Sequence, residues 1–268
     1  MNSNKPFFSV ITICLNAGDS LHRTLESIIN QTFLNFEIVV KDGISTDGSF
    51  DKINKDDRIF FIQKADKGIY DAMNQALEFV NGQYILFLNA GDYFFNDKIL
   101  QSYYNTIINN GNPNLVYCDY LTTNLNLYVQ SPLKLSNFFL FRTMLCHQVC
   151  MINKQCYDNF GNFDLSYRVC SDYDFLLRLV KKERINSCHF QELGIVSESN
   201  GFSSQFQKLA KLEVKKIRRK YYKKEFFFFN IIIFLTFPSI RQYILNRNNF
   251  LSVFYIKLVN IVNKTIIL

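Results

Sequence analysis

The chain has 268 residues, of which 48% are hydrophobic and 16% aromatic, with 28 Phe and no Trp. This apolar content excludes an intrinsically disordered chain, and the length suits one catalytic domain with an extension. The formal net charge is +7, but nine of the 30 Lys and Arg lie between Lys208 and Lys224, where Glu213 is the single acid. The basic excess is therefore mostly the property of one segment.

The seven cysteines are scattered, and no two form a CxxC pair, which is typical of a reducing compartment. Cys146, His147 and Cys150 are close enough in sequence to raise the question of zinc, but no second ligand cluster accompanies them. The polar N-terminus and the short apolar run after it do not form a secretory signal. We therefore expect a cytoplasmic protein whose cysteines are small core residues.

Strands and helices alternate from the start of the chain. Residues 8–15 (FSVITICL) form a β-branched apolar run typical of a buried strand, and residues 20–31 place Leu21, Leu25 and Ile28 on one helical face. Further strands are predicted at 36–40, 59–62, 84–88 and 115–118, and further helices at 69–80, 98–108 and 171–182. This alternation predicts an α/β fold with a Rossmann-like, mainly parallel sheet flanked by helices.

The character of the chain changes after Gly201. A basic amphipathic stretch at 205–224 runs into FFFFNIIIFLTF at 226–237, and a second apolar segment follows at 250–268. The Phe-rich run is shorter than the roughly 20 residues of a bilayer-spanning helix, which favours a shallow anchor. We predict a catalytic domain at residues 1–204 and a helical membrane-associating tail at residues 205–268. A helix packed on the domain is the alternative for the last segment.

The basic residues of this tail directly precede its aromatic run. Basic side chains beside interfacial aromatics are typical of attachment to an anionic lipid surface, where each charge contributes about 1 kcal/mol. Nucleic acid could also attract such a block of charge, but it is the weaker explanation. We expect peripheral attachment to the inner face of the plasma membrane and no nucleic-acid partner.

Polar segments follow four of the predicted strands. In parallel α/β sheets, ligands bind beyond the carboxyl ends of the strands, so these segments are the first candidates for a site. Neither GxGxxG nor the P-loop pattern occurs in them, which argues against both nucleotide-binding motifs. The segments are Asn16, KDGISTDGS at Lys41–Ser49, ADKGIYDAMN at Ala65–Asn74 and NAGDYF at Asn89–Phe94.

Five ordered motifs carry a resemblance to a known family. They are SVITICLN, QTFLNFEIVVKDGISTDGS at Gln31–Ser49, DKGIYDAMNQAL at Asp66–Leu77, YILFLNAGD at Tyr84–Asp92 and SDYDFLLRL at Ser171–Leu179. Over residues 7–204 the sequence resembles the family 2 glycosyltransferases, which adopt the GT-A fold. The resemblance implies an inverting enzyme of bacterial cell-envelope polysaccharide synthesis. It would move a hexosyl or N-acetylhexosaminyl group from a nucleotide-diphosphate sugar, UDP-linked, to a glycan or lipid-linked acceptor.

The resemblance also implies which residues bind the donor. Asp42 is expected to accept from the N3–H of the base, with a capped turn as the structural alternative. Asp66 and Asp71 precede or open a helix whose N-terminus suits diphosphate or sugar hydroxyls. His147 is expected at the metal or the diphosphate, with a core histidine as the alternative. The remaining expected donor contacts are Asn16, Lys67, Asn74 and Asn89, whereas Ser45, Thr46 and Asp47 are interpreted as turn residues.

Asp92 and Asp172 take the metal and catalytic roles that the resemblance implies. Asp92 ends a DxD-like motif that holds a divalent cation, Mg²⁺ or Mn²⁺, against the donor diphosphate, but Asn89, Ala90 and Gly91 precede it in place of an acidic triplet. Asp172 is expected to take the proton from the attacking acceptor hydroxyl, which inverts the anomeric centre. A helix N-terminal charge is the alternative for Asp172, and the favoured interpretation for Asp174.

Two other functions stay open. A catalytically inactive, membrane-associated nucleotide-sugar-binding protein is motivated by Asn89, Gly91 and Ser171, although the acids retained elsewhere argue against it. A nucleotidyltransferase would need a Gly-rich basic loop after the first strand, and Asn16–Ser20 is not such a loop.

Overall fold

The computed structural model describes residues 5–49, 53, 56–123, 126–182, 185–198 and 206–235. The chain divides into two compact units, residues 1–134 with 145–213 and residues 135–144 with 214–268. The division falls within helix α8 (Gln207–Tyr221), directly after Glu213, so the first unit contains residues beyond the boundary predicted after Ser204. The predicted apolar segment at 250–268 lies outside the described residues.

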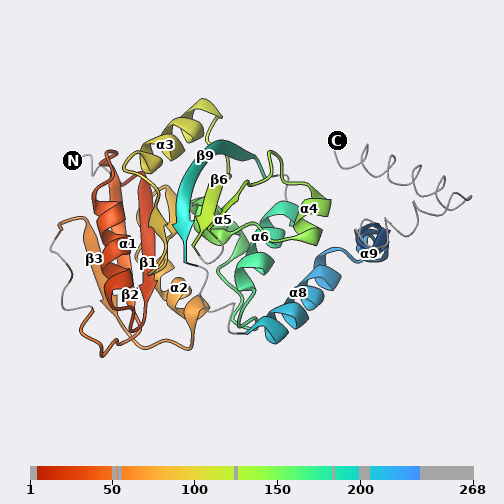
Figure 1. Cartoon of the computed structure of the whole chain (residues 1–268), viewed down its shortest axis with the longest axis horizontal. Helices are drawn as coiled ribbons and strands as arrows, with labels where there is room; N and C mark the ends of the chain where they lie inside the picture. The colour runs from red at the N-terminus through yellow and green to blue at the C-terminus, as the bar shows by residue number, and fades with distance from the viewer. Residues whose placement is uncertain are drawn as a thin grey trace, which may run out of the picture. The chain divides into compact units, whose positions relative to one another are not determined.

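A mixed β-sheet organises the described part of the first unit, and its first half is parallel (Figure 1). The register of this half pairs Phe8 with Phe36 and Cys14 with Asp42, so that β1 and β2 begin and end level with each other. The parallel strands agree with those predicted and confirm the α/β fold. In their order across the sheet they are β3 (Ile59–Gln63), β2 (Phe36–Asp42), β1 (Phe8–Cys14) and β4 (Tyr84–Phe87).

The second half of the sheet mixes directions. β8 (Met151–Asn153) is antiparallel to β4 and to β6 (Leu115–Thr122), whereas β9 (Ser187–Ser197) is parallel to β6. β5 (Tyr93–Phe94) and β7 (Leu127–Val129) add to β9 and β6, each antiparallel. The sequence predicts only β6 among these, because β5, β7 and β8 are too short to show a period of two.

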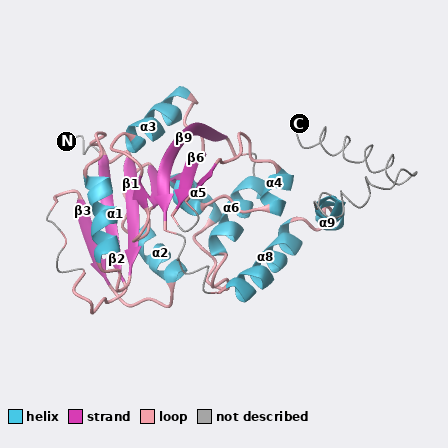
Figure 2. Ribbon diagram, in the orientation of Figure 1, coloured by secondary structure: helices cyan, strands magenta, loops and turns pink. Residues whose placement is uncertain are grey.

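Helices pack against the sheet as their apolar faces require (Figure 2). α1 (Asp19–Ile29) packs on β1 and β5 and buries Leu21, Leu25 and Ile28. α2 (Ile69–Leu77) packs on β1 and β2, α3 (Ile99–Asn109) on β6 and β9, and α5 (Lys154–Phe160) on β8. α6 (Ser171–Lys182) packs on α5.

An aromatic cluster in the core fixes the position of α6. The rings of Tyr157 and Phe175 stack with centroids 4.6 Å apart, and Phe163 contacts both of them and Phe87 on β4. Burial of one such side chain stabilises the fold by about 1.5–3 kcal/mol. Because Phe175 is in the first turns of α6, this packing holds the N-terminus of that helix near the sheet.

The second unit has an aromatic core of its own. Phe141 of α4 (Asn137–Arg142) is fully buried and contacts Tyr222, Phe226 and Phe229, the last two on α9 (Phe226–Leu235). The Arg218 guanidinium lies 5.1 Å from the centre of the Phe141 ring. Among the described residues, α9 and every other helix fall short of the length and apolar character that a membrane span requires.

Candidate active site

The carboxyl ends of β1, β2 and β4 bring three polar segments together. The Gly43 N–H, just after β2, donates to the Cys14 carbonyl at 2.9 Å, and the Ala90 N–H, just after β4, donates to the Ile13 carbonyl at 3.2 Å. The segments after β2 and β4 therefore flank the end of β1. This is the edge at which the sequence predicts a site.

Asp42 ends β2 and is fully buried. Its carboxylate accepts from the Ser45 hydroxyl, from the Ser45 N–H at 2.8 Å, from Gln63 Nε2 at 3.1 Å and from Cys14 Sγ at 3.6 Å. Burial alone would raise the pKa of Asp42, but these hydrogen bonds outweigh it and lower the pKa below the usual value. Asp42 is therefore a stable carboxylate that caps its own turn, and contact with a base stays a prediction.

The loop after β1 is tied to the loop after β2. Asn16, at a φ of 50°, accepts from the Thr46 N–H at 2.8 Å, and its own N–H donates to Ser45 Oγ at 2.8 Å. The Gly18 N–H donates to Asp47 at 2.9 Å. These are contacts of turn-forming residues, and they hold the exposed Asn16 side chain at the site edge.

A buried ion pair joins the ends of β2 and β3. The ammonium of Lys41 is fully buried, lies 2.8 Å from Asp66 Oδ2 and donates to the Lys64 carbonyl at 2.7 Å. Asp66 Oδ1 also accepts from the Gly68 N–H at 3.1 Å, and Asp71 accepts from the Lys67 N–H at 2.8 Å. The two acids thus shape the loop that opens α2.

The Asn74 side chain bonds to Phe163 of the aromatic cluster. Its amide nitrogen donates to the Phe163 carbonyl at 2.9 Å, and its amide oxygen accepts from the Phe163 N–H at 3.0 Å. Both ends of the side chain are therefore used in holding the backbone at Phe163. Direct contact of Asn74 with a donor stays a prediction.

Asp172, in the first turn of α6, is held by two side chains from elsewhere in the fold. Its Oδ1 lies 2.8 Å from the Tyr70 hydroxyl, and its Oδ2 lies 3.1 Å from His147 Nδ1. The Asp172 side chain is 7% exposed. Burial and the charge of Asp172 raise the pKa of Tyr70 well above its usual value, so Tyr70 stays protonated and donates.

His147 and Gln148, consecutive in the short 3-10 helix η2 (His147–Val149), link this acid to the segment after β4. His147 Nε2 lies 3.4 Å from Asn89 Nδ2, and Gln148 Nε2 donates to Asp92 Oδ2 at 3.1 Å. Burial lowers the pKa of His147, but its hydrogen bond to Asp172 and the two negative charges outweigh burial and raise it above its usual value. Asp172, Asn89 and Asp92 are thus gathered around one dipeptide.

Asp92 is buried and accepts three hydrogen bonds. Ser197 Oγ and the Glu198 N–H donate to its Oδ1 at 2.8 and 3.1 Å, and Gln148 donates to Oδ2. Burial raises the pKa of Asp92, against the opposing effect of these hydrogen bonds. The nearby Asn89 Oδ1 is buried without a hydrogen-bond partner among the residues that the structure describes.

These oxygens fit Mg²⁺ or Mn²⁺ only in a site that the donor completes. In the described part of the chain, no group of three or more His, Cys, Asp or Glu side chains is arranged to hold a metal ion. Mg²⁺ is commonly bound by one or two carboxylates together with substrate phosphate oxygens. Asp92 Oδ2 and the unpaired Asn89 Oδ1 provide a carboxylate and an amide oxygen of the required hard character.

Three residues with a place in this geometry are missed by the sequence analysis. They are Tyr70, Gln148 and Lys41, and each is recognised by its burial or by a partner distant in sequence. Lys41 offers one sequence signal, since a lysine directly after the apolar run at 38–40 needs a partner where the strand is buried. Tyr70 and Gln148 stand inside motifs but have no spacing that would reveal their contacts.

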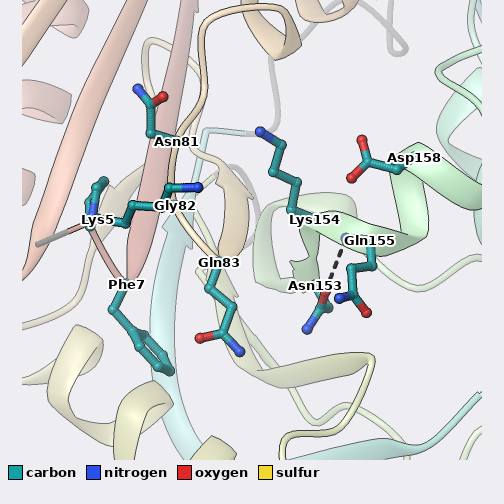
Figure 3. Close-up of a pocket in the computed structure, with 10 residues that line it drawn as sticks. Lys5, Phe7, Asn81, Gly82, Gln83, Asn153, Lys154, Gln155 and Asp158 are labelled. Carbon is teal, nitrogen blue, oxygen red and sulfur yellow. Dashed lines mark hydrogen bonds between the residues drawn. The ribbon is translucent and has the colours of Figure 1, made fainter. Parts of the chain in front are cut away.

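A cavity of about 480 Å³ lies at the opposite edge of the sheet (Figure 3). It is lined by residues at the amino ends of β1 and β4, among them Phe7 and Gly82, and by Lys154 and Asp158 of α5. Parallel strands begin at this edge, whereas Asp42 and Asn89 stand where they end. We therefore place the candidate site at the carboxyl edge and not in this cavity.

Comparison with known proteins identifies the family. Residues 9–154 match the model of the family described as "Glycosyl transferase family 2". The chain is 33% identical over 178 residues to a "PGL/p-HBAD biosynthesis glycosyltransferase" of Mycobacterium bovis, which covers 65% of this chain and 69% of that protein. This chain belongs to glycosyl transferase family 2.

Two further proteins are similar over parts of their length. The "UDP-Glc:alpha-D-GlcNAc-diphosphoundecaprenol beta-1,3-glucosyltransferase WfaP" of Escherichia coli is 42% identical over 94 residues, covering 34% of this chain and 38% of WfaP. The crystal structure of S. aureus TarS 1-349 in complex with UDP-GlcNAc matches with a TM-score of 0.65 at 18% identity, covering 80% of this chain and 67% of that one. The latter likeness supports the GT-A type of fold.

Proposed function

We propose that this chain is an inverting glycosyltransferase of cell-envelope polysaccharide biosynthesis. It moves a hexosyl or N-acetylhexosaminyl group from a UDP-linked sugar to a glycan or lipid-linked acceptor. The observation that carries the proposal is the holding of Asp172 between Tyr70 and His147 while Gln148 contacts Asp92. The names of the mycobacterial relatives and of WfaP support the envelope setting and the lipid-linked acceptor.

Asp172 acts as the general base in this proposal. Its carboxylate takes the proton of the acceptor hydroxyl as the acceptor oxygen bonds to the anomeric carbon. The bond from that carbon to the diphosphate breaks on the opposite side, so the nucleoside diphosphate leaves with the bonding electrons and the configuration inverts. Tyr70 keeps its proton because its pKa is raised, and it continues to orient Oδ1 of the base.

The donor lies along the carboxyl edge in the same proposal. Asp42 accepts from the N3–H of uracil, while Asn16, Asp66, Lys67 and Asp71 contribute donor contacts around it. The exposed Asn16 and Lys67 side chains support direct contact. For Asn74, the double hydrogen bond to Phe163 supports an indirect role, in which it fixes the backbone near the aromatic cluster.

A divalent cation, Mg²⁺ or Mn²⁺, belongs to the proposal because members of this family generally use one. Asp92 and Asn89 would hold the cation together with diphosphate oxygens. His147, which contacts Asp172, would face the cation or the diphosphate. When bound, the cation neutralises charge that grows on the leaving diphosphate.

The tail attaches the enzyme peripherally to the inner face of the plasma membrane in our proposal. Phe227 and Phe228 on α9 are 77% and 51% exposed, whereas Phe226 and Phe229 pack on Phe141. α9 thus has apolar side chains on more than the face that packs within its own unit, a pattern typical of helices that meet lipid. The basic residues before α9 suit an anionic surface, and no role for nucleic acid is proposed.

A second candidate is a nucleotide-sugar-binding protein without transferase activity. The observation that favours it is the buried state of Asp92, which already accepts three hydrogen bonds and has a raised pKa. Such a carboxylate binds a cation less readily than an open, ionised one. Donor binding without turnover would distinguish this candidate.

The test is turnover by the purified full-length protein. With Mn²⁺ and a panel of nucleotide sugars, we expect release of a nucleoside diphosphate, reduced about 100- to 10,000-fold by Asp172→Asn. Asp92→Ala should also slow release and weaken Mn²⁺ dependence. Asp158→Asn, an exposed acid at the opposite edge, is the matched control and should keep the wild-type rate.

The outcomes separate the two candidates. Equal rates for wild type, Asp172→Asn and Asp92→Ala would refute the assigned mechanism. Donor binding by calorimetry with no release from any donor and acceptor would support the inactive binding protein instead. The anomeric configuration of the product, read by NMR, should be opposite to that of the donor.

A further inference from the structure

The loop directly before α6 is held by one buried carboxylate from α8. The backbone N–H groups of Arg168, Val169 and Cys170 donate to Glu213 at 2.8, 2.9 and 2.9 Å. Arg168 bonds to Oε1, and the other two residues bond to Oε2. The Glu213 side chain is buried although it is the single acid in the basic stretch from Lys208 to Lys224.

Three successive N–H groups that converge on one carboxylate form an anion-binding concavity of the backbone. Hydrogen bonds to an ionised acceptor are roughly twice as strong as neutral ones. The carboxylate also lies at the N-terminal, positive end of α6, where a negative charge is stabilised. Glu213 is therefore in a site built for its charge, and an uncharged amide in its place would bring an N–H₂ group against backbone donors.

Other contacts tie the same loop to the start of α8. The Arg168 guanidinium lies 4.5 Å from the centre of the Phe206 ring, and Cys170 Sγ contacts the Ala210 carbonyl at 3.7 Å. Glu213 is thus the acidic part of a contact that joins the first turns of α8 to the loop before α6. All of these residues belong to the first unit.

A short chain of contacts leads from Glu213 to Asp172. The N–H of Val169 binds Glu213, and its carbonyl accepts from the Tyr70 hydroxyl at 2.7 Å. The same hydroxyl lies 2.8 Å from Asp172 Oδ1. Because this hydroxyl has one proton for two acceptors, a shift of the Val169 carbonyl changes how Tyr70 holds Asp172.

We propose that Glu213 is a positioning residue for Asp172, and that the start of α8 is therefore part of the catalytic machinery. The proposal rests on the function proposed above, in which Asp172 is the base. It assigns two roles to one helix, since the exposed Lys208, Lys211 and Lys215 of α8 suit an anionic lipid surface while its single acid orients the base. Removal of all residues after Ser204 would then abolish turnover as well as membrane attachment.

The test compares Glu213→Gln, Glu213→Asp and the control Glu192→Gln in the full chain. Glu192 is a carboxylate on β9 that accepts from Ser102 Oγ at an exposed position. A displacement of about 1 Å at a reacting group can cost about 100-fold in rate, so we expect kcat of Glu213→Gln to fall about 10- to 100-fold. The donor KM should stay unchanged, because the hydrogen bonds of the Asp42 carboxylate run to Cys14, Ser45 and Gln63 and not to this loop.

Three further readouts distinguish positioning from general damage. Glu213→Asp, which keeps the charge but is one methylene shorter, should recover part of kcat. Hydrogen exchange of the amides at 168–170 should accelerate in Glu213→Gln and not in Glu192→Gln. In the Asp172→Asn background, Glu213→Gln should cause no further loss. Assays are run well below the unfolding midpoint of each variant.

A wild-type kcat in Glu213→Gln would overturn the role of Glu213 and leave the proposed base untouched. The same follows if Glu213→Gln reduces kcat by the same factor in the Asp172→Asn background as in wild type. Full turnover by Asp172→Asn would refute the proposed base, and the positioning role would fall with it. A kcat loss that is accompanied by an equal rise in donor KM would place the effect of Glu213 at the donor and overturn the proposal.

Discussion

Asp42 illustrates at the residue scale how a buried acid is kept ionised. The pKa of Asp42 is lowered in the folded protein, so its carboxylate hydrogen bonds stabilise the fold at any pH above the ordinary pKa of 3.8. This stabilisation is lost as the pH falls through the pKa of the folded state. We predict that Asp42→Asn lowers the free energy of unfolding near neutral pH by about 1–3 kcal/mol, because its N–H₂ group would meet the Ser45 and Gln63 donors. Urea unfolding between about pH 3 and 7 measures this loss.

The difference in unfolding free energy between wild type and Asp42→Asn should shrink as the pH is lowered. The wild-type carboxyl is then protonated and uncharged, as the asparagine amide is at every pH. Asp158→Asn, at an exposed position, controls for the loss of one negative charge. A difference that is independent of pH would contradict the lowered pKa of Asp42.

The residues that sequence can identify at this site are those whose chemistry is fixed by a motif. Asp172 is predicted as a member of SDYDFLLRL and His147 from the family resemblance, and the structure brings Asp172 Oδ2 and His147 Nδ1 to 3.1 Å from each other. Tyr70 is not predicted, because its role depends on a hydroxyl buried beside residues about one hundred positions away. The sequence shows Glu213 only as one acid in a basic helix. Its burial depends on three backbone N–H groups more than forty residues away, which the sequence does not indicate.

At the scale of elements, the approach of the loop before β4 to β1 requires a glycine. A Cβ added to Gly82 would lie 2.5 Å from the Ser9 nitrogen and 2.6 Å from the Phe8 carbonyl carbon. Backbone atoms cannot turn away as a side chain can, so we predict that Gly82→Ala lowers the free energy of unfolding by about 3 kcal/mol. Urea unfolding measures the loss.

Gln83→Ala is the matched control, because Gln83 is the exposed neighbour and an alanine there meets no such obstacle. Donor KM of the folded Gly82→Ala protein should equal that of wild type, since Gly82 is at the amino edge of the sheet. An unchanged unfolding midpoint in urea would show that β1 and the loop can move apart at little cost.

The sequence predicts those strands and helices that are long and regular enough to show their hydrophobic pattern. β1, β2 and β4 read as apolar runs because both faces of these strands are buried. β9 has eleven residues but is not predicted, since its first part, Ser187–Glu192, alternates irregularly between exposed and half-buried positions. Its pairing with β6 also shifts in register, which removes a regular period.

At the scale of the whole molecule, the basic and aromatic residues of the tail should determine where the enzyme acts. Lys223 and Lys224 are exposed directly before α9, and Phe227 and Phe228 are exposed on it. If each charge contributes about 1 kcal/mol at an anionic surface, Lys223→Gln with Lys224→Gln should weaken binding to vesicles about 30-fold. Co-sedimentation with phosphatidylglycerol-containing vesicles measures the binding.

Phe227→Ser with Phe228→Ser should weaken the same binding through loss of buried apolar area, and this loss should persist at high salt, which screens only the charges. Lys64→Gln with Lys98→Gln removes two exposed charges from the first unit and should leave vesicle binding unchanged. If these two pairs of lysine changes weaken binding equally, net charge and not the tail is responsible, and the anchor is refuted.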